Sequence, residues 1–159
     1  MKFIADAMLG RLAKWLRLLG FDVLYYPDID DRMLIRIARE QDRTVLTRDT
    51  RLLRNKGIRD YIFIKSDNIF EQLSEMKIRL DFAHSELFGR CIVCNGILSD
   101  VSGKEDIREY VPDFIYHNHN DFIKCINCGK VYWKGTHHRN IKEKIIRILS
   151  DSADSPRRQ

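Results

Sequence analysis

The chain has 159 residues, and 44% of them are hydrophobic, which is enough apolar material for a core and argues against global disorder. Its net charge of +5 favours a polyanionic partner without identifying one. No apolar stretch approaches the roughly 20 residues that span a bilayer. The first residues, MKFIADAMLGRLAKW, carry charges within their apolar run, so we expect no signal peptide, no membrane partner and a cytoplasmic protein.

Strand and helix patterns alternate through the first half of the chain. The predicted strands cover residues 2–5, 22–26, 44–47 and 61–64. The predicted helices cover residues 6–19, about 30–41 and 68–78, with a short basic helix or turn up to Gly57. The side chains that we expect these helices to bury are Met8, Leu12, Trp15, Leu16 and Leu19 in the first and Leu34, Ile37 and Ala38 in the second. This order predicts an α/β fold with a mostly parallel sheet.

The pattern changes near Leu80. Paired cysteines and short β-like pieces occupy residues 90–133, and residues 140–149 form an amphipathic pattern with Asn140 and Glu143 spaced as a capping box. The last ten residues have the composition of a disordered tail. We therefore predict domains at 1–80 and 88–138, a C-terminal helix at 139–149 and a disordered tail at 150–159.

Four cysteines occur as two C-x-x-C pairs, Cys91 with Cys94 and Cys125 with Cys128. Two intervening residues let both thiolates of a pair reach one tetrahedral zinc ion at about 2.3 Å. Glycine follows each pair, as tight knuckle turns prefer. The long loop between the pairs is expected to carry extra strands. We predict a closed structural zinc site, while a redox dithiol is the alternative and would need only one pair.

Acidic residues follow every predicted strand. In a parallel sheet, the carboxyl ends of the strands share one edge, where ligands usually bind. The acids that should lie at this edge are Asp6 after the first strand, Asp30 and Asp31 after the second, Asp49 after the third and Asp67 after the fourth. Asp22 and Asp60 precede their strands and belong to the opposite edge.

Clustered carboxylates need a positive charge between them, and Mg²⁺ or Mn²⁺ supplies it through oxygen ligands. Such an ion beside a phosphodiester can activate water and neutralise the leaving oxygen. Each of these aspartates also lies near a helix start, so helix capping is the alternative for any one of them.

Basic residues flank these acids. Arg11, Lys14 and Arg17 share an arc of the first helix, and Arg48 adjoins Asp49. They are candidates for binding a phosphate backbone, or they form an ordinary solvated face. The histidines are open to two readings as well: His117 and His119 could ligate a metal and His137 and His138 could contact phosphate, but exposed histidines are usually just solvated.

Five segments together resemble a known family: FIADAMLGRLAKWLRLLGFDVLYY, DDRMLIRIA, VLTRDTRLL, RCIVCNGIL and KCINCGKVYWKGTHH. They look like the PIN-like ribonuclease family named for the C-terminal domain of the Mut-seven exonuclease, from residue 1 to about 141. The resemblance implies a three-layer α/β/α fold with a C-terminal zinc ribbon, and metal-dependent RNA cleavage by clustered acids. Carried over by position, it implies Asp6 and Asp49 as catalytic acids, Asp30 or Asp31 as a second acid and Asp67 as a fourth.

Two functions are therefore predicted. The first is an endoribonuclease that uses Mg²⁺ or Mn²⁺ and whose zinc ribbon is a structural and RNA-binding module. The alternative is a non-catalytic RNA- or ribosome-binding adaptor built on the zinc ribbon and the basic helix. RNA is the expected partner in both, and a protein regulator could restrain the activity of the first.

Overall fold

The computed structural model describes residues 1–80, 82, 87–133 and 135–150 of the chain, and for 136–138, 142 and 148–150 the backbone alone. The chain forms two compact units, Met1–Asn95 and Gly96–Gln159. The predicted tail falls mainly on residues 151–159, which lie outside the described part. Among the described residues, no helix is both long and apolar enough to cross a membrane.

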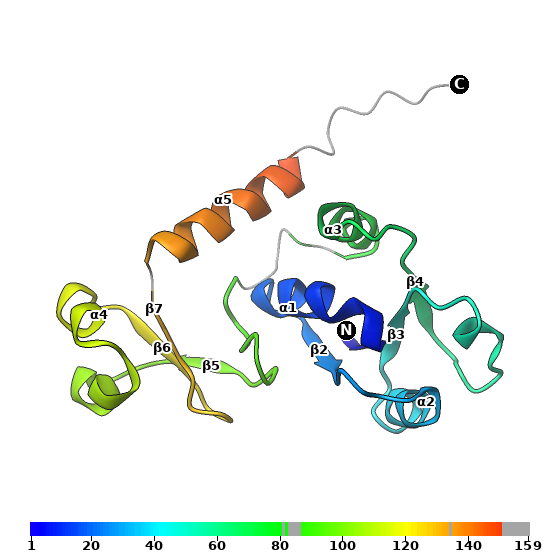
Figure 1. Ribbon diagram of the computed structural model, residues 1–159, viewed down its shortest axis with the longest axis horizontal. Helices are drawn as coiled ribbons and strands as arrows, with labels where there is room; N and C mark the ends of the chain where they lie inside the picture. The colour runs from blue at the N-terminus through cyan, green and yellow to red at the C-terminus, as the bar shows by residue number, and fades with distance from the viewer. Residues whose placement is uncertain (81, 83–86, 134, 151–159) are drawn as a thin grey trace. The chain divides into compact units, whose positions relative to one another are not determined.

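The first unit is built on a parallel sheet of four short strands (Figure 1). Its strands are β1 (Lys2–Ala5), β2 (Asp22–Tyr25), β3 (Thr44–Thr47) and β4 (Tyr61–Phe63). They are arranged in the order β2-β1-β3-β4, and Ala5 pairs with both Tyr25 and Leu46. The carboxyl ends of the strands therefore meet at one edge, as the sequence predicts.

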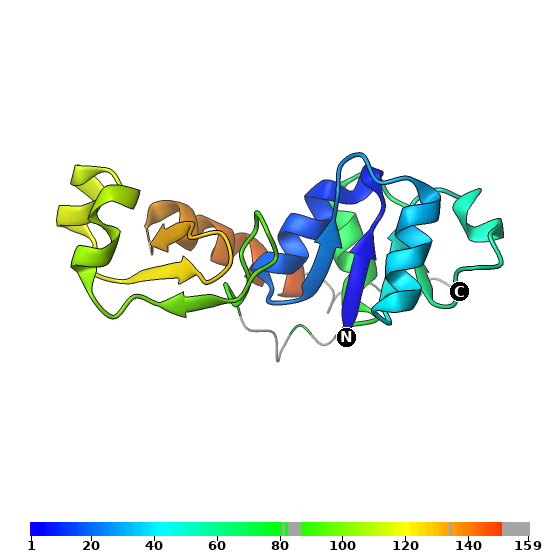
Figure 2. The ribbon, with the colours of Figure 1, turned by 90° about the horizontal axis from the view of Figure 1, so that it is seen from below.

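Helices cover both faces of this sheet. The helices of the unit are α1 (Gly10–Leu18), α2 (Asp31–Glu40) and α3 (Ile69–Lys77), with short 3-10 turns η1 (Ala7–Leu9) and η2 (Leu52–Arg54). Helices α1 and α3 lie together on one face, and α2 lies on the other (Figures 1 and 2). This is the predicted three-layer α/β/α arrangement.

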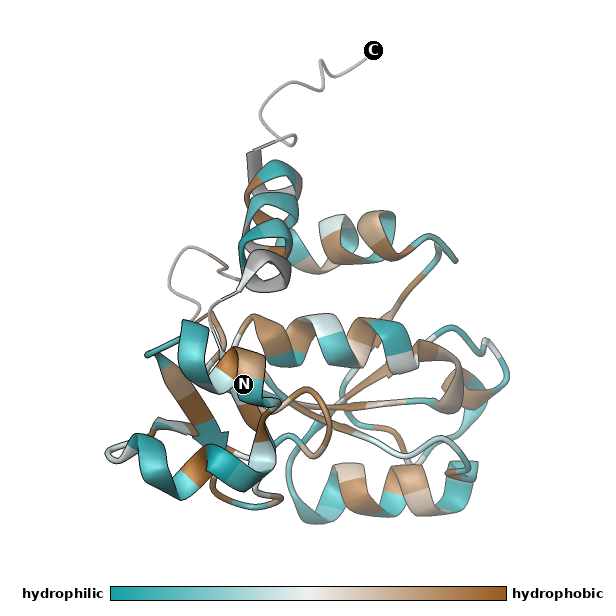
Figure 3. Cartoon of the chain, turned by 60° about the vertical axis from the view of Figure 1, so that its left-hand side comes forward, coloured by the Kyte–Doolittle hydropathy of each residue, from teal (hydrophilic) through white to brown (hydrophobic). Residues whose placement is uncertain are grey.

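The core has a part on each face. On the α2 side, Ile4 and Val45 of the sheet pack against Leu34 and Ile35, with Leu52 of η2 beside them. Figure 3 shows the consequence along α2, where hydrophobic and hydrophilic residues alternate around the helix. Ile35 is buried here, whereas the predicted core residue Ile37 is only partly buried.

The start of the first predicted helix differs from the expectation. Residues 7–9 form the 3-10 turn η1, and α1 begins only at Gly10. Met8 is 62% exposed, because it lies in that turn and is out of phase with the buried face of α1. The prediction that Met8 belongs to the core is therefore wrong, while Leu12, Leu16 and Leu19 are buried as expected.

The second unit contains an antiparallel sheet with the order β5-β6-β7. Its elements are β5 (Leu98–Asp100), η3 (Lys104–Tyr110), α4 (Asp113–Asn118), β6 (Phe122–Cys125), β7 (Val131–Trp133) and α5 (Thr136–Ser150). A small core of Ile107, Val111, Phe122 and Val131 holds η3 against the sheet.

One expectation for this second unit is met and one is corrected. The loop between the cysteine pairs carries β5 and most of β6, as expected, and it also forms the helices η3 and α4 between these strands. Ile107 of η3 packs with Phe122 of β6 and Val131 of β7, so the loop contributes to a small core. The last helix begins at Thr136, so Asn140 lies inside it and is not its N-cap.

Candidate functional site

The aspartate after β1 is locked in place by its neighbours. Asp6 is only 6% exposed, and one carboxylate oxygen accepts a hydrogen bond from the backbone N–H of Met8 at 2.8 Å. The other oxygen accepts from the Thr47 hydroxyl at 2.5 Å and from the Arg48 N–H at 2.9 Å. Asp6 therefore caps η1 and also ties β1 to the end of β3, at the edge of the sheet where its sequence position predicts it.

Thr47 connects the two principal acids. It is fully buried as the last residue of β3, and its hydroxyl donates to Asp6 and accepts from the Asp49 N–H at 2.9 Å. Asp6 and Asp49 thus share one anchoring hydroxyl, the first through its side chain and the second through its backbone. Sequence reasoning assigned no role to Thr47, although its position between a buried strand and Asp49 was the available signal.

Asp49 is held more loosely and stays accessible. Its carboxylate accepts from the backbone N–H of Arg51 at 2.8 Å and pairs with the Arg51 guanidinium at 3.4 Å. The side chain of Asp49 is 26% exposed, while that of Arg51 is 86% exposed. Hydrogen bonds from the backbone and side chain of Arg51 hold the pKa of Asp49 below its ordinary value, so the carboxylate is ionised at neutral pH.

The two acids after β2 differ from each other. Asp30 is the N-cap of α2 and accepts a hydrogen bond from the Met33 N–H at 2.8 Å. Asp31 is exposed in the first turn of the helix. The hydrogen bond and charge of Asp49 raise the pKa of Arg51, and the charge of Asp31 adds to this effect. Asp31 is therefore electrostatically linked to the Asp49 region, whereas Asp30 has a capping role.

Asp67 lies in the loop after β4 and is exposed. It does not cap α3, whose N-cap is Asn68, accepting from the Phe70 N–H at 2.9 Å. The loop is fixed instead by Glu75, whose carboxylate accepts from the N–H groups of Lys65 and Ser66, both at 2.9 Å.

The edge of the parallel sheet offers a pair of carboxylates rather than a closed acidic cage. Among the described residues, the cysteines form the one group in which three or more metal-ligating side chains converge. Magnesium, however, is usually held by one or two carboxylates together with waters and substrate phosphates. Asp6 and Asp49 are carboxylates of the kind that this donor set uses.

Three of the predicted phosphate-binding residues are available at the surface. Arg11 and Lys14 are exposed on α1, and Arg48 is partly exposed beside Asp6. Among the described residues, the buried Nε of Arg48 has no hydrogen-bond partner. A buried donor without a partner is costly, so this atom is an unsatisfied group at the sheet edge.

The fourth, Arg17, has a different environment. It is 3% exposed, and its Nε donates to the carbonyl of Val23 at 2.8 Å. Its Nη1 donates to the carbonyls of Ile92 at 3.0 Å and Val93 at 3.1 Å. The guanidinium is thus used to hold the turn between Cys91 and Cys94 against the end of α1. The enclosed guanidinium of Arg17 therefore serves the fold and is not exposed to an RNA backbone.

A second set of polar contacts holds the same turn. Asn95, at a positive φ of 67°, accepts from the Val23 N–H at 3.0 Å and donates to Asp22 at 2.8 Å. Asp22 also pairs with Arg43 at 2.7 Å and Arg90 at 3.6 Å. Burial raises the pKa of Asp22, but hydrogen bonds from Arg43 and Asn95 outweigh it and leave the pKa below its ordinary value. Asp22 is therefore structural and lies at the edge away from Asp6, as its position before β2 predicts.

Replacing Arg17 by methionine should lower the free energy of unfolding by about 3 kcal/mol, because the buried carbonyl of Val23 and the partly buried ones of Ile92 and Val93 lose their donor while the apolar stem remains. Denaturant unfolding measures this change. The control is Lys14→Met on the same helix, where an exposed side chain should change stability by less than about 0.5 kcal/mol. Equal stability of the two variants would show that the Arg17 contacts contribute nothing.

The four cysteines converge on one point. The sulfur atoms of Cys91, Cys94, Cys125 and Cys128 all lie within 4.8 Å of one another, and Cys91 and Cys125 are buried. Such a set could hold one zinc ion through four thiolates, which closes its coordination shell. A redox dithiol would not require both pairs to meet.

Glycine is required after each cysteine pair, but for a different structural reason in each case. Gly129 has a positive φ of 73°, as a tight turn requires. A Cβ at Gly96 would lie 2.8 Å from the Cys125 sulfur, so no side chain fits there. After the first pair, the residue with a positive φ is Asn95 rather than a glycine.

The histidines stay outside the cysteine group. His117 is exposed in α4, and His119 is the C-cap of that helix. Neither belongs to a converging set of metal-ligating side chains in the described part of the chain. The side chains of His137 and His138 lie outside the described residues.

Comparison with known proteins adds one finding. The family described as the Mut7-C RNAse domain matches residues 1–145 of the chain. Neither the curated proteins nor the solved structures contain a match. The matched range includes both the acids at the sheet edge and all four cysteines.

Proposed function

Because the chain belongs to the Mut7-C RNAse domain family, we propose that it is an endoribonuclease that hydrolyses RNA phosphodiester bonds with Mg²⁺ or Mn²⁺ at the edge of the parallel sheet. The observation that carries this proposal is the pairing of Asp6 and Asp49 through the Thr47 hydroxyl. It places the backbone of Asp49 beside the Asp6 carboxylate, at the edge where open α/β sheets bind their substrates.

Asp6 and Asp49 would be the protein ligands of the catalytic ion. Asp6 is rigid, since protein donors contact both of its oxygens, whereas Asp49 can exchange its contact with Arg51 for the ion. Asp31 would contribute charge or a water-mediated contact, with Asp30 fixing the start of α2 and Asp67 as an outer acid. When bound, the ion supplies an activated water and charge stabilisation for the departing oxygen.

Basic residues around the pair would hold the RNA. Arg48 is partly exposed beside Asp6, so its guanidinium would contact a phosphate near the acids. Arg11 and Lys14 extend positive charge along the exposed side of α1. Contacts of this kind bind the phosphate backbone without reading the bases, and they weaken as salt increases.

Zinc at the four cysteines would be structural. A closed thiolate shell leaves no position for water or substrate, so the ion would stabilise the fold around it. We also propose that the second unit contributes to RNA binding. A protein regulator and a cytoplasmic location stay predictions from the sequence.

One observation favours the second candidate, a non-catalytic RNA-binding adaptor. The described carboxylates do not converge in a set of three, and Asp49 already has Arg51 as a partner. An adaptor would bind RNA equally well with and without divalent ions and would cut nothing.

The metal requirement separates the two candidates. The protein, loaded with zinc, is incubated with labelled single-stranded RNA in buffer without added divalent ions, and then with Mg²⁺ or Mn²⁺. Chelators are avoided, because they would also remove zinc and unfold its site. The proposal expects cleavage with the added ion alone, at constant zinc content. Cleavage without added ion would contradict the proposed mechanism, and binding without cleavage in all conditions would favour the adaptor.

A further inference from the structure

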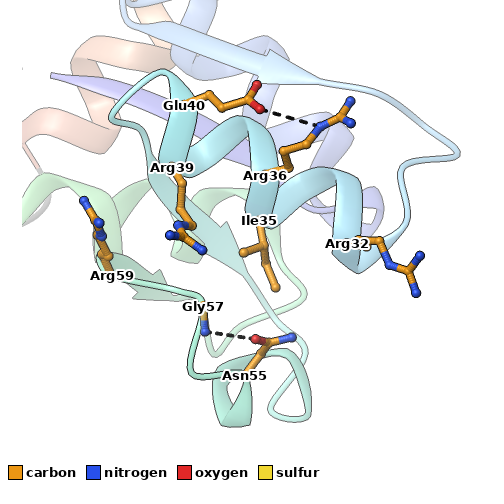
Figure 4. A pocket seen from close by; sticks show the side chains of 8 residues that line it. All are labelled: Arg32, Ile35, Arg36, Arg39, Glu40, Asn55, Gly57 and Arg59. Atoms are coloured by element: carbon orange, nitrogen blue, oxygen red, sulfur yellow. Dashed lines mark hydrogen bonds and ion pairs between the residues drawn. The ribbon is translucent and has the colours of Figure 1, made fainter.

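An open hollow of about 620 Å³ lies between α2 and the loop that leads from η2 to β4. Its lining includes four arginines: Arg32, Arg36 and Arg39 from the helix and Arg59 from the loop. In Figure 4, Arg36 is directed toward Glu40, whereas Arg39 lies between the helix and the loop. The helical arginines follow the i, i+4, i+7 spacing, which places them along one face of α2. None of the four was a predicted site residue, because the sequence does not show that residues 55–59 pass beside this helix.

Most of this positive charge is not neutralised. Within the described part of the chain, the side chains of Arg32, Arg39 and Arg59 form no ion pair or hydrogen bond. Arg36 forms an exposed pair with Glu40 at 3.9 Å. A hollow lined by three uncompensated guanidinium groups favours a polyanion over a neutral ligand.

The floor of the hollow is built by close packing. A Cβ on Gly57 would lie 3.0 Å from Cγ2 of Ile35, so the loop backbone runs directly against the helix. The Gly57 N–H donates to the Asn55 side chain at 3.0 Å, which fixes this approach. The base of the hollow is therefore made by the contact between Gly57 and Ile35, and arginine side chains lie around it.

Its position links it to the acids at the sheet edge. Arg32 directly follows Asp31, which interacts electrostatically with Arg51, the partner of Asp49. From Arg32 to Arg39 the helix advances about 10 Å away from that edge. The arginines thus extend from the acids along the α2 face, whereas Arg11 and Lys14 lie on α1, in the opposite layer of helices.

We propose that this hollow binds the phosphate backbone of the RNA strand on one side of the cleavage point. The inference rests on the proposed ribonuclease function and adds a second contact region to it. Arginine suits this role because its planar guanidinium can donate two hydrogen bonds to one phosphate. RNA long enough to reach from Asp49 into the hollow should bind more tightly than RNA that covers the acids alone.

The test uses the double variant Arg39→Gln/Arg59→Gln in the full-length chain. Affinity is measured without divalent ions, so that no cleavage intervenes, for single-stranded RNAs of about four and about fifteen nucleotides. We expect about tenfold weaker binding of the longer RNA and little change for the shorter one. The plot of log affinity against log salt concentration should become shallower by about 1.4 for the longer RNA, because each phosphate that the variant no longer neutralises lowers the slope by about 0.7.

The matched control is Lys2→Gln/Arg79→Gln, which removes the same charge from exposed positions of the first unit outside the hollow. An equal weakening in the control would overturn the proposal, since net charge alone would then explain the effect. Unchanged binding of the longer RNA by the hollow variant would also overturn it. So would inorganic phosphate that competes equally with the shorter and the longer RNA, because the hollow would then add nothing to the binding of a longer strand.

Cleavage measured in parallel separates this inference from the proposed function. If the protein cuts RNA but its RNA binding does not depend on Arg39 and Arg59, the ribonuclease function is supported and the RNA-binding role of the hollow is refuted. If the affinity for the longer RNA falls in the variant but the protein never cuts RNA, the RNA-binding hollow is supported and the ribonuclease function is refuted. Circular dichroism melting of both variants checks that they remain folded.

Discussion

Replacing Asp49 by asparagine is expected to reduce RNA cleavage by about 100-fold or more, because the proposed ion at the sheet edge would lose an anionic ligand and with it part of its stabilisation of the transition state. The fold should persist, since the side chain is partly exposed and an asparagine oxygen can still accept the hydrogen bond from the Arg51 N–H. Zinc content should also be unchanged. The measurement is the initial rate of cleavage of labelled single-stranded RNA in Mg²⁺ or Mn²⁺.

Asp49 is a better test than Asp6. Asp6 is buried and accepts from the Met8 N–H, the Thr47 hydroxyl and the Arg48 N–H. An asparagine there would place its NH₂ group, which cannot accept a hydrogen bond, against one or more of these donors, and this would weaken the fold itself. Loss of activity in that variant would not separate chemistry from stability.

The matched control for Asp49 is Asp60→Asn, which removes the same charge at the opposite edge of the sheet, just before β4. It should cleave at the wild-type rate. Full activity of Asp49→Asn, or an equal loss in the control, would contradict the assigned metal site.

Replacing Cys125 by serine is expected to reduce the bound zinc from about one ion per chain to nearly none, because a tetrahedral thiolate site does not tolerate the loss of a ligand. Since Cys125 is also the last residue of β6, the small β5-β6-β7 sheet should lose its resistance to proteolysis. The four-stranded parallel sheet has its own core on both faces and should remain protected. Elemental analysis of zinc and limited proteolysis with mass spectrometry measure the two effects.

Val93→Ser is the control for this substitution. Val93 lies between Cys91 and Cys94 and is 57% exposed, so its side chain can change without loss of a thiol. Its carbonyl still accepts from Arg17. The variant should keep its zinc, and a stoichiometric ion retained by Cys125→Ser would show that the four cysteines are not the site.

The two experiments address different parts of the chain. Asp49→Asn should keep zinc and lose cleavage, whereas Cys125→Ser should lose zinc. If Cys125→Ser still cuts RNA, zinc is needed only for its own surroundings. If it loses cleavage while the parallel sheet stays intact, the second unit takes part in handling the substrate.

The sequence by itself determined the α/β alternation, the sheet edge that carries Asp6 and Asp49, and the four-cysteine group. Strand and helix periodicities are local, and in a parallel sheet every residue that follows a strand lies at the same edge. The C-x-x-C spacing likewise sets the reach of two thiolates without knowledge of the rest of the fold. These features depend on short stretches of chain, so they could be predicted.

Only the tertiary structure decided the environment of individual side chains. Arg17 shares a helical arc with Arg11 and Lys14, yet it is buried because its acceptors, Ile92 and Val93, come from a turn 75 and 76 residues later in the chain. Contacts at that separation leave no local pattern in the sequence.

The same reason applies to the acids and to the arginine hollow. Thr47 joins Asp6 across 41 residues, and the hollow exists because the backbone at Gly57 packs on Ile35 of another element. Periodicity identified which residues could face a ligand. A charged side chain binds another part of the chain or stays accessible to an anion, depending on which distant segment packs beside it. Only the tertiary structure shows which segment that is.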